Sequence, residues 1–221
     1  GRSSGKETVD PAAYAARLGG APEIALLPGS RDGEIERLLP VMLGAADILS
    51  RRHPGARFLL SRSASVAPER LSDIAAAHGR HLPFEVVSTG LGEIYRRAAL
   101  VIAASGTVTL ETALAGIPMI VVYRVSPISY RLGKALIRVD HISLVNLIAG
   151  RRLVPELVQD DASAEKIADT AAGLLSDTDG LLAMQRALTT LAGRLGRSGA
   201  SERTAEIALG LLDARRRRAD G

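Results

Sequence analysis

At 221 residues, of which 47% are hydrophobic, the chain can bury a sizeable core as one large or two small domains, which excludes an intrinsically disordered protein. It contains no cysteine, so disulfides and thiolate metal sites are excluded, and no apolar run approaches the roughly 18 residues of a membrane-spanning helix. The net charge is +4, and the four arginines at 215–218 contribute as much by themselves. Aromatic residues make up only 3%, so few side chains could stack on single-stranded nucleic acid, and we expect no nucleic-acid partner.

The first 20 residues begin with a run rich in Gly, Ser and Lys and then reach Asp10-Pro11, which is a helix-start signal. They predict a linker that carries one short helix over 11–18. Gly1 is not followed by a charged and then apolar leader, so we expect no signal peptide and a chain that continues a longer protein.

From residue 21 onward, short apolar runs alternate with longer segments of helical periodicity. The predicted strands cover 24–27, 58–61, 84–87, 100–104 and 119–123. Each is apolar on both faces, which is typical of a parallel sheet with helices on both sides. Helices are expected over 34–49, 69–77, 92–98 and 108–115, with Pro40 kinking the first or shifting its start, and over 164–175, 181–195 and 202–212.

These elements predict an α/β fold, namely a doubly wound, Rossmann-like parallel sheet with a helical C-terminal stretch. We divide the chain into a linker (1–20), one binding domain (21–199), and a C-terminal helix with a basic tail (200–221).

The strand over 100–104 is followed at once by Ser105-Gly106-Thr107 and then by a helix. Unpaired backbone N–H groups at a helix start attract phosphate, Gly106 allows a close approach, and the two hydroxyls add donors. Glu111, four residues after Thr107, lies on the same helical face and could accept hydrogen bonds from two ribose hydroxyls. The alternative is that Ser105 and Thr107 merely cap the helix and Glu111 offsets its dipole.

A second turn of this kind follows the first strand, in LLPGSRDGE. Pro28-Gly29 predicts a turn, and Ser30 and Arg31 stand just before the next helix. A guanidinium suits a diphosphate, and open α/β sheets bind ligands at the carboxyl ends of their strands. The alternative is that Arg31 belongs to an ordinary surface ion pair.

A metal site is not expected. Asp177-Thr178-Asp179 has the acid-x-acid pattern of a cation site, but it lies between two late helices, far in sequence from both turns. No strand is followed by the G-x-G-x-x-G pattern of a dinucleotide site, and we expect no cofactor.

Five sequence blocks occur in order over 21–176: LPGSR with an acidic helix, SGT-TLE, P-M-VVYR, NLIAGR and VPEL-Q. Together they resemble the C-terminal half of the lipid-A-disaccharide synthases. The resemblance implies a GT-B glycosyltransferase, in which one Rossmann-like domain holds UDP-2,3-diacylglucosamine and the other, N-terminal one receives 2,3-diacylglucosamine 1-phosphate. Its inverting reaction would yield lipid A disaccharide 1-phosphate and UDP without a metal or cofactor. The catalytic base would come from the N-terminal domain, which this chain lacks.

The resemblance also assigns roles to positions of this sequence. Ser30 and Arg31 would approach the nucleotide, Ser105, Gly106 and Thr107 the diphosphate, Glu111 the ribose, and Asn146 with Gln159 the rim of the donor site. Backbone groups of 84–91 would meet the uracil. For Asn146 and Gln159 the alternatives are a cap of the turn before Gly150 and a solvent residue at a helix end.

We therefore expect a chain that binds UDP or its sugar but does not turn over alone. The resemblance implies a cytoplasmic enzyme with peripheral contact to the inner face of the inner membrane, where acylated sugars are collected. Two alternatives stay open: another GT-B enzyme, such as a cell-wall N-acetylglucosaminyl transferase or a UDP-sugar epimerase, and a non-catalytic module that uses its basic tail.

Overall fold

A computed structural model describes residues 8–79, 82–125 and 141–195. The helix expected over 202–212 and the arginines at 215–218 lie outside the described residues. Within the described part, no helix combines the length and the apolar character needed to cross a membrane.

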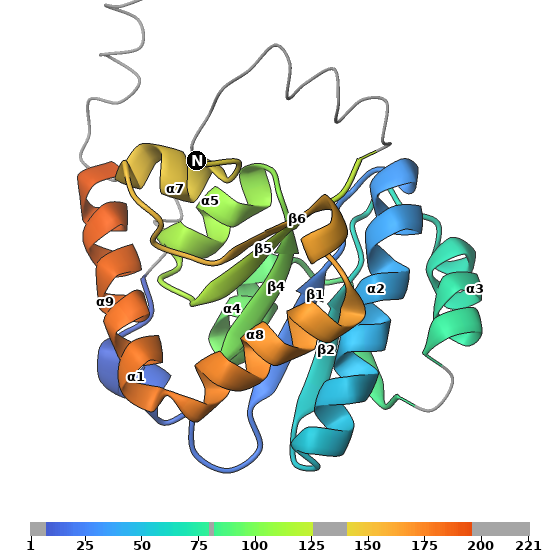
Figure 1. The fold of residues 1–221 in the computed structure, drawn as a ribbon, viewed down its shortest axis with the longest axis horizontal. Coiled ribbons are helices and arrows are strands. Elements are labelled where there is room, and N and C mark those ends of the chain that lie inside the picture. Colours follow the sequence, from blue (N-terminus) through green and yellow to red (C-terminus); the bar gives the residue numbers. More distant parts are fainter. Residues whose placement is uncertain (1–7, 80–81, 126–140, 196–221) are drawn as a thin grey trace, which may run out of the picture.

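The core of the molecule is a six-stranded, wholly parallel sheet in the order β3-β2-β1-β4-β5-β6 (Figure 1). Its strands are β1 (Glu23–Leu27), β2 (Arg57–Ser61), β3 (Phe84–Val87), β4 (Leu100–Ala104), β5 (Met119–Tyr123) and β6 (Glu156–Val158). All five expected strands are confirmed. The sixth was not foreseen, because β6 has only three residues and each is half-buried at a sheet edge.

Helices cover both faces of the sheet, which confirms the doubly wound α/β fold (Figure 1). One face packs against α2 (Asp32–Arg52), α3 (Pro68–His78) and α8 (Ala164–Ser176). The other packs against α4 (Leu91–Arg97), α5 (Thr107–Leu114), α7 (Leu144–Ala149) and α9 (Thr178–Leu195). Helix α2 runs on through Pro40, so this proline does not shift its start.

Residues 8–18, the described part of the expected linker, pack against the sheet domain. Their short helix, α1 (Pro11–Ala15), is confirmed, and the ring of Tyr14 is fully buried. The Tyr14 hydroxyl donates a hydrogen bond of 2.6 Å to the carbonyl of Ala99, and the Val9 N–H donates one of 3.0 Å to the carbonyl of Ala115. Buried area and these two bonds hold residues 8–18 on the domain.

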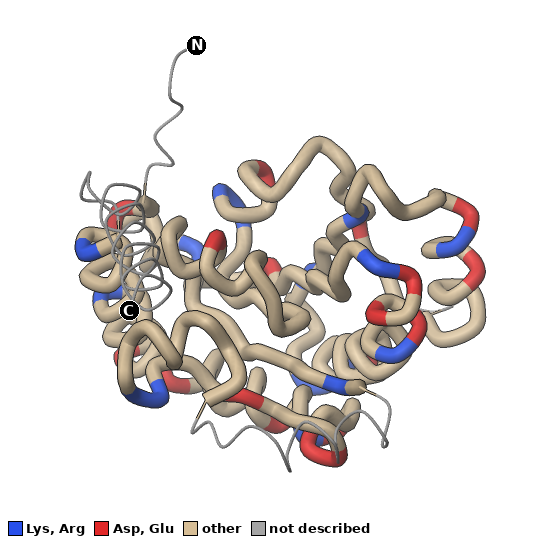
Figure 2. The backbone as a smooth tube through the Cα atoms, turned by 90° about the horizontal axis from the view of Figure 1, so that it is seen from above, with Lys and Arg blue, Asp and Glu red and all other residues tan. Residues whose placement is uncertain are grey.

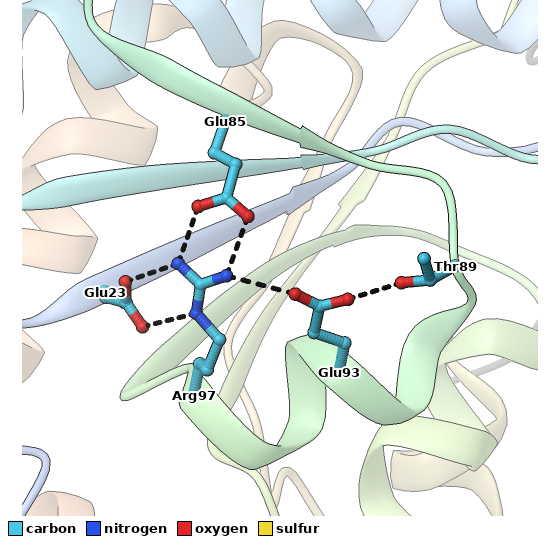
Figure 3. Close-up of polar contacts among 5 residues, drawn as sticks. All are labelled: Glu23, Glu85, Thr89, Glu93 and Arg97. Atoms are coloured by element: carbon cyan, nitrogen blue, oxygen red, sulfur yellow. Dashed lines mark hydrogen bonds and ion pairs between the residues drawn. The ribbon is translucent and has the colours of Figure 1, made fainter.

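A cluster of charged side chains links α4 to the amino ends of two strands (Figure 3). The guanidinium of Arg97 makes paired hydrogen bonds with Glu23 of β1 at 2.8 and 3.0 Å and with Glu85 of β3 at 2.8 Å. Glu93 approaches Arg97 at 3.3 Å and accepts a hydrogen bond from the hydroxyl of Thr89. Planar Arg–carboxylate pairs of this kind fix the orientation of the elements that they join. The cluster lies at the amino end of β1, whereas the two predicted ligand turns follow the carboxyl ends of β1 and β4.

This cluster predicts an acid-sensitive contribution to stability. The hydrogen bond with Arg97 holds the pKa of Glu85 below its usual value of 4.5. A carboxyl whose folded pKa is lowered contributes stability above its unfolded pKa and loses it as the pH falls through the folded one. In urea unfolding at about pH 3.5 and pH 7, Arg97→Met should weaken the dependence of unfolding free energy on pH. Arg96→Met, on the same helix and exposed, is the control, and equal pH dependence in both variants would contradict the assignment.

Candidate functional site

The two predicted ligand turns meet at the point where the order of strands reverses. The chain passes from β1 outward to β2 and β3 and then returns to the other side of β1 as β4. Leu27 pairs with Ala103, so the turns that follow β1 and β4 are neighbours at the carboxyl edge of the sheet, near the top of Figure 1. Figure 2 looks down on the molecule from that side and shows basic and acidic positions interspersed. Ligands of open α/β sheets bind at such a reversal.

The turn after β4 leaves the start of α5 uncapped. Ser105 is half-buried, and its N–H donates to the carbonyl of Val122 at 2.9 Å. Gly106 and Thr107 are exposed, and a side chain added at Gly106 would meet no atom within 4 Å. No side chain in the described part of the chain caps the helix at Gly106. The first N–H groups of α5 therefore remain available to an anion, and the alternative in which Ser105 and Thr107 act only as caps finds no support.

Glu111 stands one helical turn beyond Thr107 on α5 and is half-buried. Its surroundings include Tyr95 of α4, whose hydroxyl lies 3.1 Å from that of Thr112. Burial raises the pKa of Tyr95 to about 12, and the negative charge of Glu111 adds to that rise. Glu111 is therefore near Tyr95 of α4.

The turn after β1 favours glycine because its backbone has a positive φ, which residues with a side chain rarely adopt. Gly29 has φ +108°, and a Cβ there would lie 2.5 Å from a carboxylate oxygen of Glu34. Arg31 directly precedes α2, and its side chain is 83% exposed and pairs with Glu34 at 3.1 Å. An exposed ion pair is worth only about 0–1 kcal/mol, so the guanidinium can exchange Glu34 for a phosphate at little cost. The predicted surface ion pair is present, and it leaves Arg31 available to a ligand.

A third loop reaches this edge and was not foreseen from the sequence. The exposed side chain of Ser65, in the connection after β2, donates a hydrogen bond of 3.0 Å to the carbonyl of Ser30. Its hydroxyl also lies 2.9 Å from that of Ser63. The signal was Ser61-Arg62-Ser63, a polar run that starts at a strand end, but it lacks the glycine that drew attention to the other two turns.

Asn146 lies in the interior and not on the rim of the site. It belongs to α7, a helix that was not among those expected, and it is fully buried. Its Oδ1 accepts from the N–H groups of Leu153 and Val154 at 2.7 and 3.0 Å. Its Nδ2 donates to the carbonyl of Val154 at 2.9 Å and to Glu156 at 2.8 Å. All four hydrogen-bonding positions of the amide are thus used within the chain, which leaves none for a ligand.

Gln159 is likewise engaged with the chain itself. It is half-buried, and its φ of 54° lies in the left-handed region that few residues other than glycine adopt. Its Oε1 accepts from the N–H of Val125 at 2.7 Å, and its Nε2 donates to the carbonyl of the same residue at 3.1 Å. The structure thus brings together the turns of Ser30-Arg31 and Ser105-Gly106-Thr107, whereas Asn146 and Gln159 support the backbone nearby.

Among the described residues, no group of three or more His, Asp or Glu side chains could hold a metal ion. Asp177, the first residue of the acid-x-acid pattern, instead accepts a hydrogen bond of 2.9 Å from the N–H of Gly180 at the start of α9. That carboxylate therefore has a local structural role.

Solved structures share this fold at low sequence identity. MurG of Acinetobacter baumannii is 17% identical, with a TM-score of 0.58 over 91% of this chain and 53% of that one. WaaG, a glycosyltransferase involved in lipopolysaccharide biosynthesis, is 14% identical, with a TM-score of 0.58 over 94% of this chain and 54% of that one. These likenesses concern the fold alone.

Curated relatives are much more similar in sequence. Lipid-A-disaccharide synthase of Geobacter sulfurreducens is 42% identical over 189 residues, which are 86% of this chain and 49% of the relative. The enzyme of Nitrosococcus oceani is 40% identical over 190 residues, with 86% and 48% covered. The chain thus spans about half the length of the curated relatives that it matches. The model of the lipid-A-disaccharide synthetase family matches residues 16–210. This chain therefore belongs to the lipid-A-disaccharide synthetase family.

Proposed function

We propose that this chain is the donor-binding part of an inverting glycosyltransferase of lipid A biosynthesis. The reaction transfers 2,3-diacylglucosamine from its UDP donor to 2,3-diacylglucosamine 1-phosphate and yields lipid A disaccharide 1-phosphate and UDP. The observation that carries the proposal is the uncapped start of α5, which adjoins the turn of Arg31 at the strand-order reversal. Family membership supports the choice of this sugar nucleotide.

The proposed binding mode follows from the chemistry of the two turns. The first N–H groups of α5 and the hydroxyls of Ser105 and Thr107 donate hydrogen bonds to the diphosphate, and the helix dipole favours its charge. Arg31 leaves its exposed pair with Glu34 and adds a positive charge. Glu111 accepts hydrogen bonds from the ribose hydroxyls.

These donors act on the leaving group of the reaction. As the bond between the anomeric carbon and the diphosphate breaks, negative charge grows on the diphosphate oxygens, and fixed N–H groups and a guanidinium stabilise it most at that stage. The acceptor hydroxyl must lose its proton to a base, which we assign to the acceptor-binding part of the longer enzyme. This chain alone is expected to bind UDP without turning over.

The proposal extends to organisation and location. We assign donor binding to residues 21–199 and the connection from the acceptor-binding part to residues 1–20. Both substrates carry acyl chains, so the enzyme would work in the cytoplasm in peripheral contact with the inner face of the inner membrane. The other GT-B activities share the fold, but the family match over 16–210 favours lipid A synthesis over them.

The proposal is tested by isothermal calorimetry of the 221-residue chain with UDP and with UMP. UDP should bind at one site and more tightly than UMP, because only UDP has a second phosphate for the start of α5. The absence of heat at millimolar UDP would refute the proposal. Equal affinity for the two nucleotides would refute the assignment of the diphosphate to α5.

A further inference from the structure

Two side chains from the end of the sheet hold the backbone on either side of residues 126–140. The amide of Gln159 binds both the N–H and the carbonyl of Val125, at 2.7 and 3.1 Å. The carboxylate of Glu156 accepts from the N–H groups of Ile142 and Ser143, at 3.0 and 2.9 Å, and from the Ser143 hydroxyl at 2.6 Å. Gln159 therefore holds the backbone just before this segment, and Glu156 holds it just after.

The carboxylate of Glu156 is half-buried and held as an anion by hydrogen bonds. A fourth hydrogen bond, of 2.8 Å, reaches it from Nδ2 of Asn146. Burial opposes its ionisation, but the bonds from Ser143, Ile142 and Asn146 outweigh burial and hold the pKa of Glu156 below its usual range. Because it occupies the start of α7, an anionic ligand has no place there.

Both held points are linked to the turn that follows β4. The hydroxyl of Ser105 lies 3.5 Å from the carbonyl of Ile142, whose N–H is bound by Glu156. The N–H of Ser105 donates to the carbonyl of Val122, in the strand that leads to Val125. A shift of either held point would therefore be transmitted to Ser105 through one intervening hydrogen bond or one short stretch of strand.

We propose that Glu156 and Gln159 are positioning residues of the nucleotide site, which set the Ser105-Gly106-Thr107 turn without touching the ligand. The inference rests on the proposed function, since it concerns the turn that would bind the diphosphate. Accurate placement matters because a hydrogen bond weakens steeply when its angle or length departs from the optimum. Both residues act through backbone groups, so any replacement that keeps their size but alters their donors and acceptors tests the idea.

The test uses two replacements of nearly equal shape. In Glu156→Gln, a single acceptor oxygen replaces the two carboxylate oxygens that four donors now share, and the NH₂ group faces at least one backbone N–H group. In Gln159→Glu, a carboxylate oxygen faces the carbonyl of Val125. Glu165→Gln, at an exposed carboxylate on α8, is the matched control.

Calorimetry with UDP and UMP provides the first readout. Each of the two variants should bind UDP about tenfold more weakly at unchanged stoichiometry, the factor expected when one buried hydrogen bond is lost. UMP affinity should change much less, so that the preference for UDP falls. A merely structural role would lower the fraction of competent protein, and hence the stoichiometry, without altering that preference.

Amide hydrogen exchange of a peptide covering the turn, measured without nucleotide, provides the second readout. Exchange there should be faster in Glu156→Gln and Gln159→Glu than in wild type and in Glu165→Gln. Wild-type exchange together with a wild-type preference for UDP in both variants would overturn the inference while the proposed function stands. If wild type fails to bind UDP, the proposed function fails, and with it the assignment of these residues to a nucleotide site. Should Glu156→Gln not fold, Gln159→Glu decides the question by the same two measurements.

Discussion

Asn146→Asp is expected to lower the free energy of unfolding by about 3 kcal/mol at neutral pH, because two buried hydrogen bonds become repulsive contacts. In the native protein, Nδ2 donates to the carbonyl of Val154 and to the carboxylate of Glu156. An oxygen in its place faces both acceptors, and one of them carries a negative charge. The two bonds accepted by Oδ1 are kept, so the variant isolates the donor half of the amide.

The pH dependence of this variant has a definite sign. The introduced carboxyl lies beside an ionised Glu156 in a buried place, so its folded pKa should exceed its unfolded value of about 3.9. A group of that kind stabilises the folded state below its unfolded pKa and loses that contribution as the pH rises through its folded pKa. Urea unfolding should therefore show a larger loss at about pH 8 than at about pH 5.

A double replacement provides the matched control. When Asn146→Asp is combined with Glu156→Gln, a hydrogen bond can form again between the two positions. Its direction is reversed, because position 156 now carries the amide donor and position 146 the carboxylate acceptor. The free energy of unfolding of the double variant should exceed the value expected from adding the two single effects by about 1 kcal/mol. Strict additivity, or a loss below about 1 kcal/mol in Asn146→Asp itself, would show that the hydrogen bonds of Asn146 contribute little.

Joint replacement of Ser105 by Ala, Thr107 by Val and Glu111 by Gln should weaken UDP binding by roughly 100-fold or more, because hydrogen bonds to charged groups contribute more than neutral ones. Ser105 and Thr107 lose donors to the diphosphate, and Glu111 loses the charge that attracts the ribose hydroxyls. The N–H groups at the start of α5 stay in place, so some affinity should remain. Calorimetry with UDP measures the effect.

The control for this variant changes the same residue types at exposed positions outside the two ligand turns. Ser176→Ala, Thr190→Val and Glu165→Gln together alter exposed positions on α8 and α9 and should leave UDP affinity unchanged. Thermal unfolding of both triple variants verifies that each is folded. Full UDP affinity in the variant at 105, 107 and 111 would contradict the proposed binding mode, whereas equal losses in both variants would indicate a general loss of folded protein.

Much of the fold could be predicted because its signals are local. The five foreseen strands are apolar on both faces, a pattern that buried parallel strands require. Helix α7 escaped prediction because its surface is reversed: Leu144, Leu147 and Ile148 are 37–44% exposed, whereas Asn146 is buried. Prediction from an amphipathic pattern assumes that the apolar residues face the core, so this helix was not recognised from the sequence.

The sequence by itself determined the alternation of strands and helices, the two turns that end in Ser30-Arg31 and Ser105-Gly106-Thr107, and the family. Each of these depends on residues close together along the chain. Only the tertiary structure decided that the two turns are neighbours, since this depends on the pairing of β1 with β4. It also decided that the amides of Asn146 and Gln159 form hydrogen bonds within the protein. Except for the carboxylate of Glu156, their partners were backbone groups, which every residue carries, and so no side-chain pattern could reveal which of them would lie within hydrogen-bonding distance after folding.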